Sequence, residues 1–287
     1  VPAGAGKLGQ YLGSGAFSNV LVYNAVNRDD VFVKIPKSYR MKKSLEGEAT
    51  VLRMLSSECP DSIPKLYNYS SNTLVDELRI HVRCESSAVP CLLLTGVIGQ
   101  PASHGDAAKK NLKVVYQKVL EALQYAHSKG ICHLDVRPSN IIIDGEGEAM
   151  KVMLADWGCA AVMTSKLKGF RGCPPYAHDE LFPPESPESK CLKDWNPEKK
   201  HDLASLAYTL AGLEQGDAIP WFGFANHLAV PEIQKKNRLD KALGILRPML
   251  FDKCEIIDVE RRALLKAIGY SEDDGVAGAN GKRCRNG

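Results

Sequence analysis

Apolar and polar residues alternate along the first third of the chain, which is the pattern of half-buried β-strands. Residues 8–23 and 30–36 are rich in Val, Leu, Tyr and Phe around glycines and an Asn-Arg-Asp-Asp turn. A helix is predicted from about Arg40 to Leu55, where the apolar residues follow a helical spacing. Further strands are predicted at residues 63–69, 78–84 and 91–98.

Helical periodicity dominates from about residue 108 onward. A first apolar stripe at helical spacing is followed by Gly130, a typical helix terminator, and consists of Leu112, Val115, Val119, Leu123 and Ala126. A second stripe consists of Leu203, Leu206, Leu210 and Leu213, and a third lies within residues 255–268. A sheet-rich lobe followed by a helix-rich lobe predicts an α+β, bilobal fold with a junction near residues 96–106.

The expected organisation has four parts. An N-terminal extension of residues 1–7 precedes a small lobe of residues 8–98, with an antiparallel sheet and one main helix. A larger, mostly helical lobe covers residues 99–270. The tail of residues 271–287 is rich in Gly, Asp, Lys and Arg, so we expect it to be disordered. Because the chain begins at Val1 rather than at methionine, we also expect a fragment of a longer protein.

Composition narrows the class of protein without naming an activity. The 287 residues are 44% apolar and 25% charged, as in ordinary globular proteins. A net charge of +3 is too small to make nucleic acid or an anionic membrane the main partner, and no apolar run approaches the roughly 18 residues of a membrane span. Nine cysteines without a C-x-x-C pair favour a reducing compartment and argue against a zinc site. We therefore expect an intracellular protein of the cytoplasm or nucleus, with a secreted effector acting inside another cell still open.

A polar segment from His133 to Asn140 lies between two apolar stretches, in the sequence ICHLDVRPSNIII of residues 131–143. A structural turn needs Gly, Asn or Pro and has no use for an acid, a guanidinium and an amide at this spacing. We therefore interpret Asp135 and Asn140 as groups that face a reacting centre, and His133 as a structural residue of the loop.

Two glycines one residue apart, Gly13 and Gly15, lie between predicted strands in the sequence LGSGAFSNV. Their backbone N–H groups can approach an anion closely, although a plain hairpin turn explains this motif equally well. A dinucleotide-binding motif is excluded because a strand follows, where that motif requires a helix.

Lys34 occupies an alternating apolar strand, VFVKIPK, where a buried ammonium group needs a partner. In the helix that follows, Glu48 falls on the apolar stripe, whereas Glu46 points away from it. A buried carboxylate in turn requires a cation. We therefore predict an ion pair between Lys34 and Glu48, with a surface lysine at a strand edge as the alternative.

Asp156 ends another apolar strand in the sequence MLADWGCA of residues 153–160. A simple cap between strand and loop is one interpretation. In the other, Asp156 and Asn140 supply two oxygen ligands to Mg²⁺, which prefers carboxylate, carbonyl and phosphate oxygens. Asp135 then faces a hydroxyl group to be deprotonated, and Asn140 faces the metal on the other side of a transferred phosphate.

Taken together and in this order, the motifs resemble those of eukaryotic-type protein kinases. Residues 13–15 resemble the loop that covers the phosphates, and residues 133–140 resemble the catalytic loop. Residues 156–158, Asp-Trp-Gly, resemble the metal-binding triplet, and residues 172–180, GCPPYAHDE, resemble the end of an activation segment. Asp202 resembles the acid that anchors the backbone of the catalytic loop.

The resemblance covers residues 8–268 and implies an ATP-dependent, Mg²⁺-dependent kinase acting on Ser or Thr of a protein substrate. It implies that Asp135 is the catalytic base and that Lys34 and Arg137 also take part in catalysis. The nucleotide-binding residues that it implies are Leu12, Gly13, Ser14, Gly15, Val20, Lys34, Glu48, Leu94, Val97 and Ile142.

Several residues depart from the family pattern. Leu134 replaces the arginine that normally pairs with a phosphate on the activation segment, so we expect activity that does not depend on that phosphate. Arg137 replaces a lysine, Trp157 replaces phenylalanine, and Ser18 replaces a third glycine. Phe32 stands where the family has a small residue over the adenine, so we expect it to narrow or reshape the nucleotide pocket.

Two alternative functions remain open at this stage. The first is a pseudokinase scaffold that binds nucleotide weakly or not at all, for which Phe32 is the main evidence. The second is a small-molecule kinase of the aminoglycoside type, which shares the H-x-D-x-x-x-x-N pattern. Residues 172–180 argue against the second, because such enzymes lack an activation segment that docks a peptide.

Overall fold

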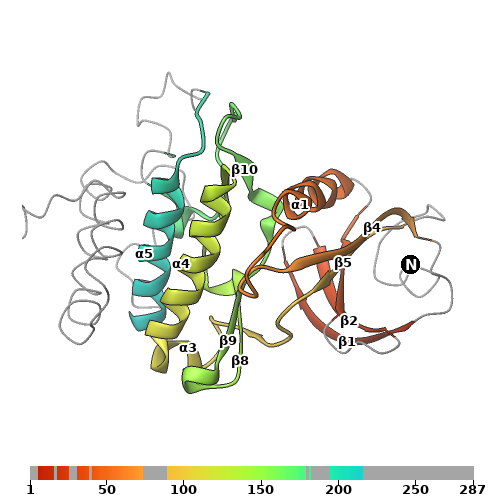
Figure 1. The fold of residues 1–287 in the computed structure, drawn as a ribbon, viewed down its shortest axis with the longest axis horizontal. Helices are drawn as coiled ribbons and strands as arrows, with labels where there is room; N and C mark the ends of the chain where they lie inside the picture. Colours follow the sequence, from red (N-terminus) through yellow and green to blue (C-terminus); the bar gives the residue numbers. More distant parts are fainter. Residues whose placement is uncertain are drawn as a thin grey trace, which may run out of the picture.

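A five-stranded antiparallel sheet forms the small lobe of the computed structural model, which describes residues 6–15, 18–25, 31–38, 41–73, 89–178, 181 and 194–215 (Figure 1). In sheet order the strands are β1 (Gly6–Ser14), β2 (Ser18–Ala25), β3 (Val31–Pro36), β5 (Val89–Thr95) and β4 (Lys65–Thr73). The central strand β3 is buried along its whole length, because it pairs with β2 on one side and β5 on the other. Lys34, in the middle of this strand, is therefore buried.

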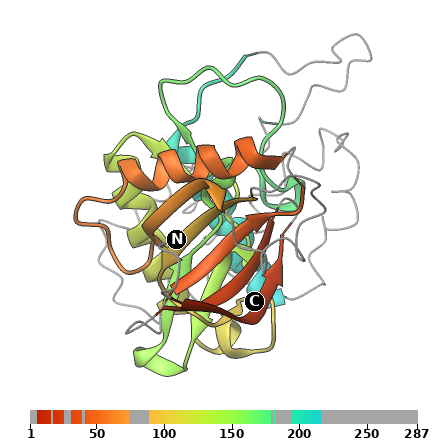
Figure 2. The same cartoon turned by 90° about the vertical axis from the view of Figure 1, so that its right-hand side faces the viewer.

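Helix α1 (Lys42–Met54) lies along one side of this sheet (Figure 2). It packs against β3, β4 and β5. The packed face consists of Leu45, Glu48, Ala49, Val51 and Leu52, which recur at helical spacing. The predicted helix and its buried face are confirmed, and the buried face carries one carboxylate, Glu48.

The predicted strands match the structure in position but not at their ends. Residues 8–23 divide into β1 and β2, because the Gly15 N–H donates to the Ser18 carbonyl and closes a turn. The strand predicted at 63–69 is β4, displaced toward the C-terminus, and the strand predicted at 91–98 is β5, which ends at Thr95. After Thr95 the chain passes so close to Ile143 that a Cβ at Gly99 would collide with the Ile143 carbonyl. The prediction at 78–84 lies outside the described residues.

Two long helices lie side by side in the large lobe (Figure 1). They are α4 (Leu112–Ser128) and α5 (Lys199–Gln215), and a short helix α3 (Ala107–Lys110) precedes α4. The first predicted stripe is buried in α4 as expected, and α5 is buried continuously from His201 to Leu213. The stripe at 255–268 and the tail lie outside the described residues.

Short strands and 3-10 turns connect these helices and carry the polar loops. The short strands form two small antiparallel sheets. One contains β6 (Gln100–Pro101), β8 (Ile141–Asp144) and β9 (Lys151–Leu154), and the other contains β7 (Ile131–Cys132) and β10 (Ala161–Val162). The 3-10 turns are η2 (Pro138–Asn140), η3 (Gly147–Ala149), η4 (Trp157–Cys159) and η5 (Pro174–Tyr176).

One hydrophobic core continues through both lobes, from Phe32 and Leu52 in the small lobe to Trp157 and Leu206 in the large lobe. The predicted α+β, bilobal fold is therefore confirmed. The proposed boundary at residues 98 and 99 falls between β5 and β6 and stays a prediction. Within the described part of the chain, no helix is long and apolar enough to cross a membrane.

Candidate active site

The polar segment 133–140 forms the loop between β7 and β8, and helix α5 holds its backbone. Asp202 is fully buried and accepts hydrogen bonds from the backbone N–H of His133 at 2.8 Å and of Leu134 at 2.7 Å. His127 contacts the same carboxylate at 2.8 Å. Burial alone would raise the pKa of Asp202, but these hydrogen bonds outweigh it and lower the pKa. Asp202 is thus an ionised anchor for the loop.

His133 is a structural part of this loop. Its Nδ1 accepts a hydrogen bond from the Asp135 N–H at 3.2 Å, so the ring proton lies on Nε2, which donates to the Ala155 carbonyl at 3.1 Å. Burial lowers the pKa of His133, and the ring packs edge-on against Trp157. A neutral ring with both nitrogens bonded inside the protein agrees with the expectation that His133 holds the loop.

Asp135 has one carboxylate oxygen that is hydrogen-bonded and one that is buried without a hydrogen-bond partner among the described residues. Oδ2 accepts a hydrogen bond from Asn140 Nδ2 at 2.8 Å and lies 3.3 Å from Arg137 Nε. Oδ1 is buried and has no hydrogen-bond partner among the described residues. Burial raises the pKa of Asp135 to about 6, because the nearby charge of Arg137 offsets only part of the loss of solvation. The side chain is thus fixed through Oδ2, while Oδ1 has no hydrogen-bond partner among the described residues.

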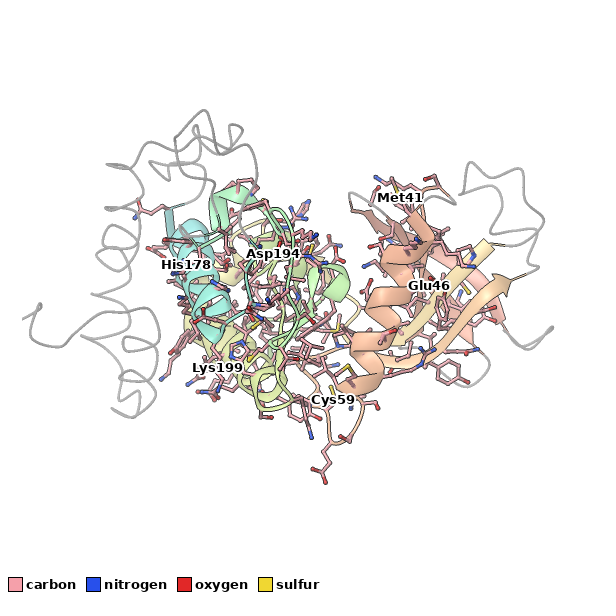
Figure 3. The ribbon with its side chains drawn as sticks, turned by 90° about the horizontal axis from the view of Figure 1, so that it is seen from above. Met41, Glu46, Cys59, His178, Asp194 and Lys199 are labelled. Atoms are coloured by element: carbon pink, nitrogen blue, oxygen red, sulfur yellow. The ribbon has the colours of Figure 1, made fainter. Side chains whose placement is uncertain are left out.

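Lys34 joins two carboxylates from opposite sides of the cleft. Its Nζ lies 2.7 Å from Glu48 Oε2 on α1 and 2.6 Å from Asp156 Oδ1 after β9. Burial would lower the pKa of Lys34, but the charges of Asp156 and Glu48 outweigh it and raise the pKa. The predicted Lys34–Glu48 ion pair is confirmed, and Asp156 is a second partner that the sequence did not suggest. Glu46, labelled on α1 in Figure 3, instead accepts a hydrogen bond from Tyr69 at 3.3 Å.

Asp156 and Asn140 are neighbours through the backbone, since the Ala155 N–H donates to the Asn140 carbonyl at 2.7 Å. Asn140 Nδ2 also donates to the Asp135 carbonyl at 2.9 Å, so both of its hydrogens are used within the loop and its amide oxygen remains as the acceptor. The charge of Lys34 lowers the pKa of Asp156 and keeps it ionised. One carboxylate and one amide oxygen are a donor set suited to Mg²⁺.

These groups meet at a cavity of about 610 Å³ between the lobes. The following predicted residues line it: Leu12, Gly13, Ser14, Gly15, Val20, Lys34, Glu48, Leu94, Val97, Arg137, Asn140, Ile142 and Asp156. Asp135 does not line the cavity itself but is bonded to Arg137 and Asn140, which do. The structure therefore gathers the predicted residues around one cavity, with Asp135 at its edge.

Other residues of the cavity had no signal in the sequence. Met153, Ala155, His104 and Ser139 line it as well, and each is an ordinary apolar or polar residue of a strand or loop. Phe32 also lines the cavity and is only 6% exposed. Its ring approaches the backbone at Gly96, beside Met153. Phe32 is thus part of the cavity wall. That it narrows the nucleotide pocket stays a prediction.

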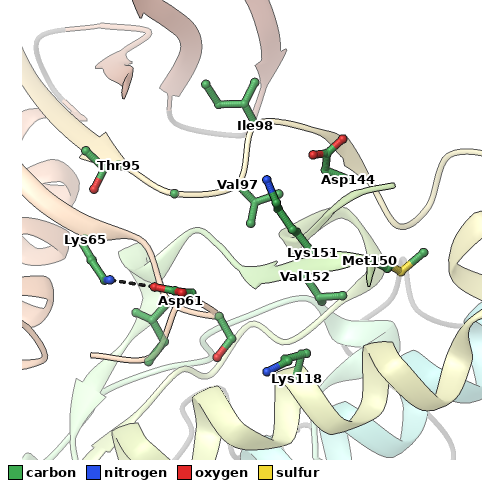
Figure 4. A pocket seen from close by; sticks show the side chains of 13 residues that line it. Asp61, Lys65, Thr95, Val97, Ile98, Lys118, Asp144, Met150, Lys151 and Val152 are labelled. Atoms are coloured by element: carbon green, nitrogen blue, oxygen red, sulfur yellow. Dashed lines mark hydrogen bonds and ion pairs between the residues drawn. The ribbon is translucent and has the colours of Figure 1, made fainter. Parts of the chain in front are cut away.

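A larger cavity of about 890 Å³ lies on the other side of the segment 95–98 (Figure 4). It shares only Val97 with the first cavity and contains none of the predicted catalytic or metal-binding residues. Its charged residues are Asp61, Lys65, Lys118, Asp144 and Lys151. The candidate chemistry therefore belongs to the smaller cavity.

Comparison with known proteins agrees with this geometry. Residues 7–221, most of the chain, match the family model described as protein kinase domain. The curated relatives include a probable myosin light chain kinase from Dictyostelium discoideum, 29% identical over 61% of this chain and 49% of the relative. They also include a calcium/calmodulin-dependent protein kinase type 1 from Macrobrachium nipponense, 28% identical over 69% of this chain and 54% of the relative. The serine/threonine-protein kinase pakG from Dictyostelium discoideum is 27% identical over 73% of this chain and 16% of that relative.

The chain thus spans about half the length of the first two relatives and less of the third. The match over residues 7–221 shows that this chain belongs to the protein kinase family.

Proposed function

We propose that this chain is an active protein kinase that transfers the γ-phosphate of ATP to a Ser or Thr hydroxyl of a protein substrate. The observation that carries the proposal is the state of Asp135. Its Oδ2 is held by Asn140 and Arg137, while Oδ1 has no partner among the described residues. A fixed, buried carboxylate with one oxygen that lacks a hydrogen-bond partner suits a general base that accepts a proton from a hydroxyl.

The pKa of Asp135 supports this role. At about 6 it lies just below physiological pH, so most of the carboxylate is ionised there and can still bind a proton. Arg137 contributes a positive charge 3.3 Å from Oδ2 and also lines the cavity. We propose that Arg137 keeps Asp135 oriented and stabilises negative charge on the transferred phosphoryl group.

Lys34 would bind the phosphates of the nucleotide. Glu48 is 1% exposed and fixes the lysine from the helix side. Gly15 lies opposite Asp156, so that a Cβ at Gly15 would be 3.8 Å from Asp156 Oδ2. The glycine loop is therefore close to the charged centre, where the phosphates of a nucleotide would lie. The adenine would lie near Val20, Leu94, Val97 and Ile142, which line the same cavity.

Asn140 and Asp156 would hold Mg²⁺, through the amide oxygen and the carboxylate. When bound, the ion would neutralise charge on the β- and γ-phosphates. Asp156 Oδ1 lies 2.6 Å from Lys34 Nζ. We propose that this ion pair would open when nucleotide and metal bind. Lys34 would then contact the phosphates, and Asp156 would contact the metal.

The Ser/Thr preference and the protein nature of the substrate rest on family evidence. The relatives named above are a probable myosin light chain kinase, a calcium/calmodulin-dependent protein kinase and a serine/threonine-protein kinase. The test is to incubate the purified chain with Mg²⁺ and γ-labelled ATP in the presence of casein, myelin basic protein and histone. Acid hydrolysis of labelled protein should release phosphoserine or phosphothreonine. Release of phosphotyrosine alone would contradict the Ser/Thr assignment.

A nucleotide-free scaffold is the second candidate, and Phe32 favours it. The ring lines the cavity together with Met153, where it would reduce the room for an adenine. Thermal unfolding separates the two candidates, because a ligand at about 100 times its Kd adds roughly 2.7 kcal/mol to the stability of the folded state. A melting temperature of the parent chain unchanged by millimolar ATP, with or without Mg²⁺, together with an ATP-induced rise in Phe32→Ala, would support the scaffold with Phe32 as its cause.

A further inference from the structure

A short segment before α5, residues 194–198, runs alongside residues 163–169 and is called the strap (Figure 1). Residues 163–169 belong to the expected activation segment, which begins at Asp156 and ends with residues 172–180. Trp195 and Leu167 form an antiparallel bridge with two backbone hydrogen bonds. The Leu167 N–H donates to the Trp195 carbonyl at 2.8 Å, and the Trp195 N–H donates to the Leu167 carbonyl at 3.1 Å. The strap thus pairs with the middle of the activation segment.

Side chains of the strap extend this pairing over residues 163–169. Trp195 Nε1 donates to the Gly169 carbonyl at 3.0 Å. Asn196 Nδ2 donates to the Ser165 carbonyl at 3.0 Å and lies 3.5 Å from the Met163 carbonyl. These contacts satisfy backbone carbonyls along the segment without any phosphate.

Beneath the bridge, apolar side chains fill the position where a phosphate-binding arginine would lie. Leu134 is 4% exposed and packs with Leu167, Cys132 and Ala161, and Trp195 covers this cluster from outside. A buried cluster of this composition has no group that could bind a phosphate. It holds the activation segment on the catalytic loop by excluding water from apolar surface.

The other end of the strap is fixed to the anchor of the catalytic loop. The Trp195 ring packs edge-on against His201, with 5.3 Å between the ring centroids. The Glu198 N–H donates to His201 Nδ1, and the His201 N–H donates back to the Glu198 carbonyl, each at 3.0 Å. His201 precedes Asp202, which holds the loop that carries Asp135. Figure 3 shows the start of the strap, Asp194, on the large lobe.

The far end of the activation segment lies directly on the catalytic loop. A Cβ at Gly172 would collide with the Leu134 carbonyl, and φ at Gly172 is +91°, which favours glycine. The next residue, Cys173, has its Sγ 4.0 Å from Arg137 Nη1. We therefore expect a shift of residues 163–169 to change the contacts of the catalytic loop near Arg137 and Asp135.

We propose that Trp195 is a positioning residue that keeps the activation segment docked in its substrate-binding arrangement, in place of a regulatory phosphate. This inference rests on the proposed function, since it assigns a control mechanism to the same site. It predicts two separable effects of Trp195→Ala: loss of protection of residues 163–169, and weaker use of protein substrate with nucleotide binding intact.

Limited trypsin digestion tests the first effect without requiring any kinase activity. Lys166 and Lys168 are exposed but flank the bridged Leu167, and a paired backbone resists proteolysis. Cleavage at these lysines, followed by mass spectrometry, should be at least about tenfold faster in Trp195→Ala. Tyr67→Ala, which removes an aromatic residue that is 53% exposed on β4, is the matched control and should digest like the parent chain. Rates within about twofold of the parent in Trp195→Ala would overturn the docking role.

Steady-state kinetics test the second effect. In Trp195→Ala, kcat/KM for protein substrate should fall at least about tenfold, whereas KM for ATP should change less than about twofold. Trp195→Phe keeps the ring but loses the bond to Gly169, so its loss should be smaller. Faster cleavage with unchanged kcat/KM would overturn the positioning role. If Trp195→Ala does not fold, as judged by its melting temperature, Asn196→Ala serves instead. That side chain is exposed, and its removal breaks the bonds to the carbonyls of residues 163 and 165. A parent chain that phosphorylates nothing but digests as predicted would refute the proposed function and not the docking of the strap.

Discussion

Replacing Asp135 by asparagine should stabilise the fold while it abolishes turnover. The carboxyl has a pKa of about 6 in the folded chain, against an ordinary value of 3.8. Ionising Asp135 is therefore harder in the folded state than in the unfolded state. The stability that Asp135 contributes is fully present below pH 3.8 and is lost as the pH rises through 6.

The size of the effect follows from this difference in pKa. At pH 7 the ionised carboxylate lowers the free energy of unfolding by about 3 kcal/mol, and at pH 5 by roughly half that amount. Asparagine carries no charge, and its amide oxygen can take the place of Oδ2 opposite Asn140. Asp135→Asn should therefore be more stable than the parent chain by up to about 3 kcal/mol at pH 7, a rise in melting temperature of roughly 5 °C.

Urea unfolding at pH 7 and pH 5, followed by tryptophan fluorescence, measures this directly. The difference in the free energy of unfolding between Asp135→Asn and the parent chain should be smaller at pH 5 than at pH 7. Asp61→Asn is the matched control, because its side chain is 96% exposed and its partner Lys65 lies on the surface. An Asp135→Asn variant that is less stable than the parent at pH 7, or an advantage independent of pH, would refute the assigned pKa of Asp135.

Three further predictions concern the same cleft. Glu48→Gln should destabilise the fold by about 1 to 3 kcal/mol in urea unfolding and raise KM for ATP, because a buried ammonium loses a charged partner; unchanged values of both would argue against the ion pair. Asp156→Asn should remove most of the extra thermal shift that Mg²⁺ adds to ATP, and a Mg²⁺-dependent shift equal to that of the parent would exclude Asp156 as a ligand. Phosphatase treatment and the double substitution Thr164→Ala, Ser165→Ala should each leave the initial rate comparable to that of the untreated parent, since Leu134 cannot bind a phosphate. A drop of about a hundredfold in either sample would mean that another basic residue binds one.

The sequence predicted the parts of the site that lie on regular elements. Lys34 and Glu48 each fall on a buried face of a strand or helix, where an unpaired charge is unfavourable, so their pairing could be inferred from periodicity alone. The bond from Lys34 to Asp156 could not be inferred, because the two residues are 122 positions apart in the chain and only the tertiary fold brings them together.

Contacts within irregular segments were also beyond prediction. Asn140 was expected to face a metal, and the structure adds that its amide nitrogen holds Asp135. Trp195 lies in a stretch without apolar periodicity, so no pattern indicated that it bonds to Leu167 and Gly169. The replacement of the family's arginine by Leu134 was visible in the sequence. The residues that pack on Leu134, including Leu167 and Trp195, come from distant parts of the chain and could not be predicted.

The measurement that tests the central claim most directly compares the parent chain and Asp135→Asn in one set of samples. Phosphate incorporation from Mg²⁺–ATP into a protein substrate is followed at pH 7.5, and the ATP-induced thermal shift is recorded on the same preparations. The parent should phosphorylate the substrate at least about a hundredfold faster than Asp135→Asn, with similar thermal shifts in both. A folded, ATP-binding parent chain that is no faster than Asp135→Asn on any protein substrate would contradict the account.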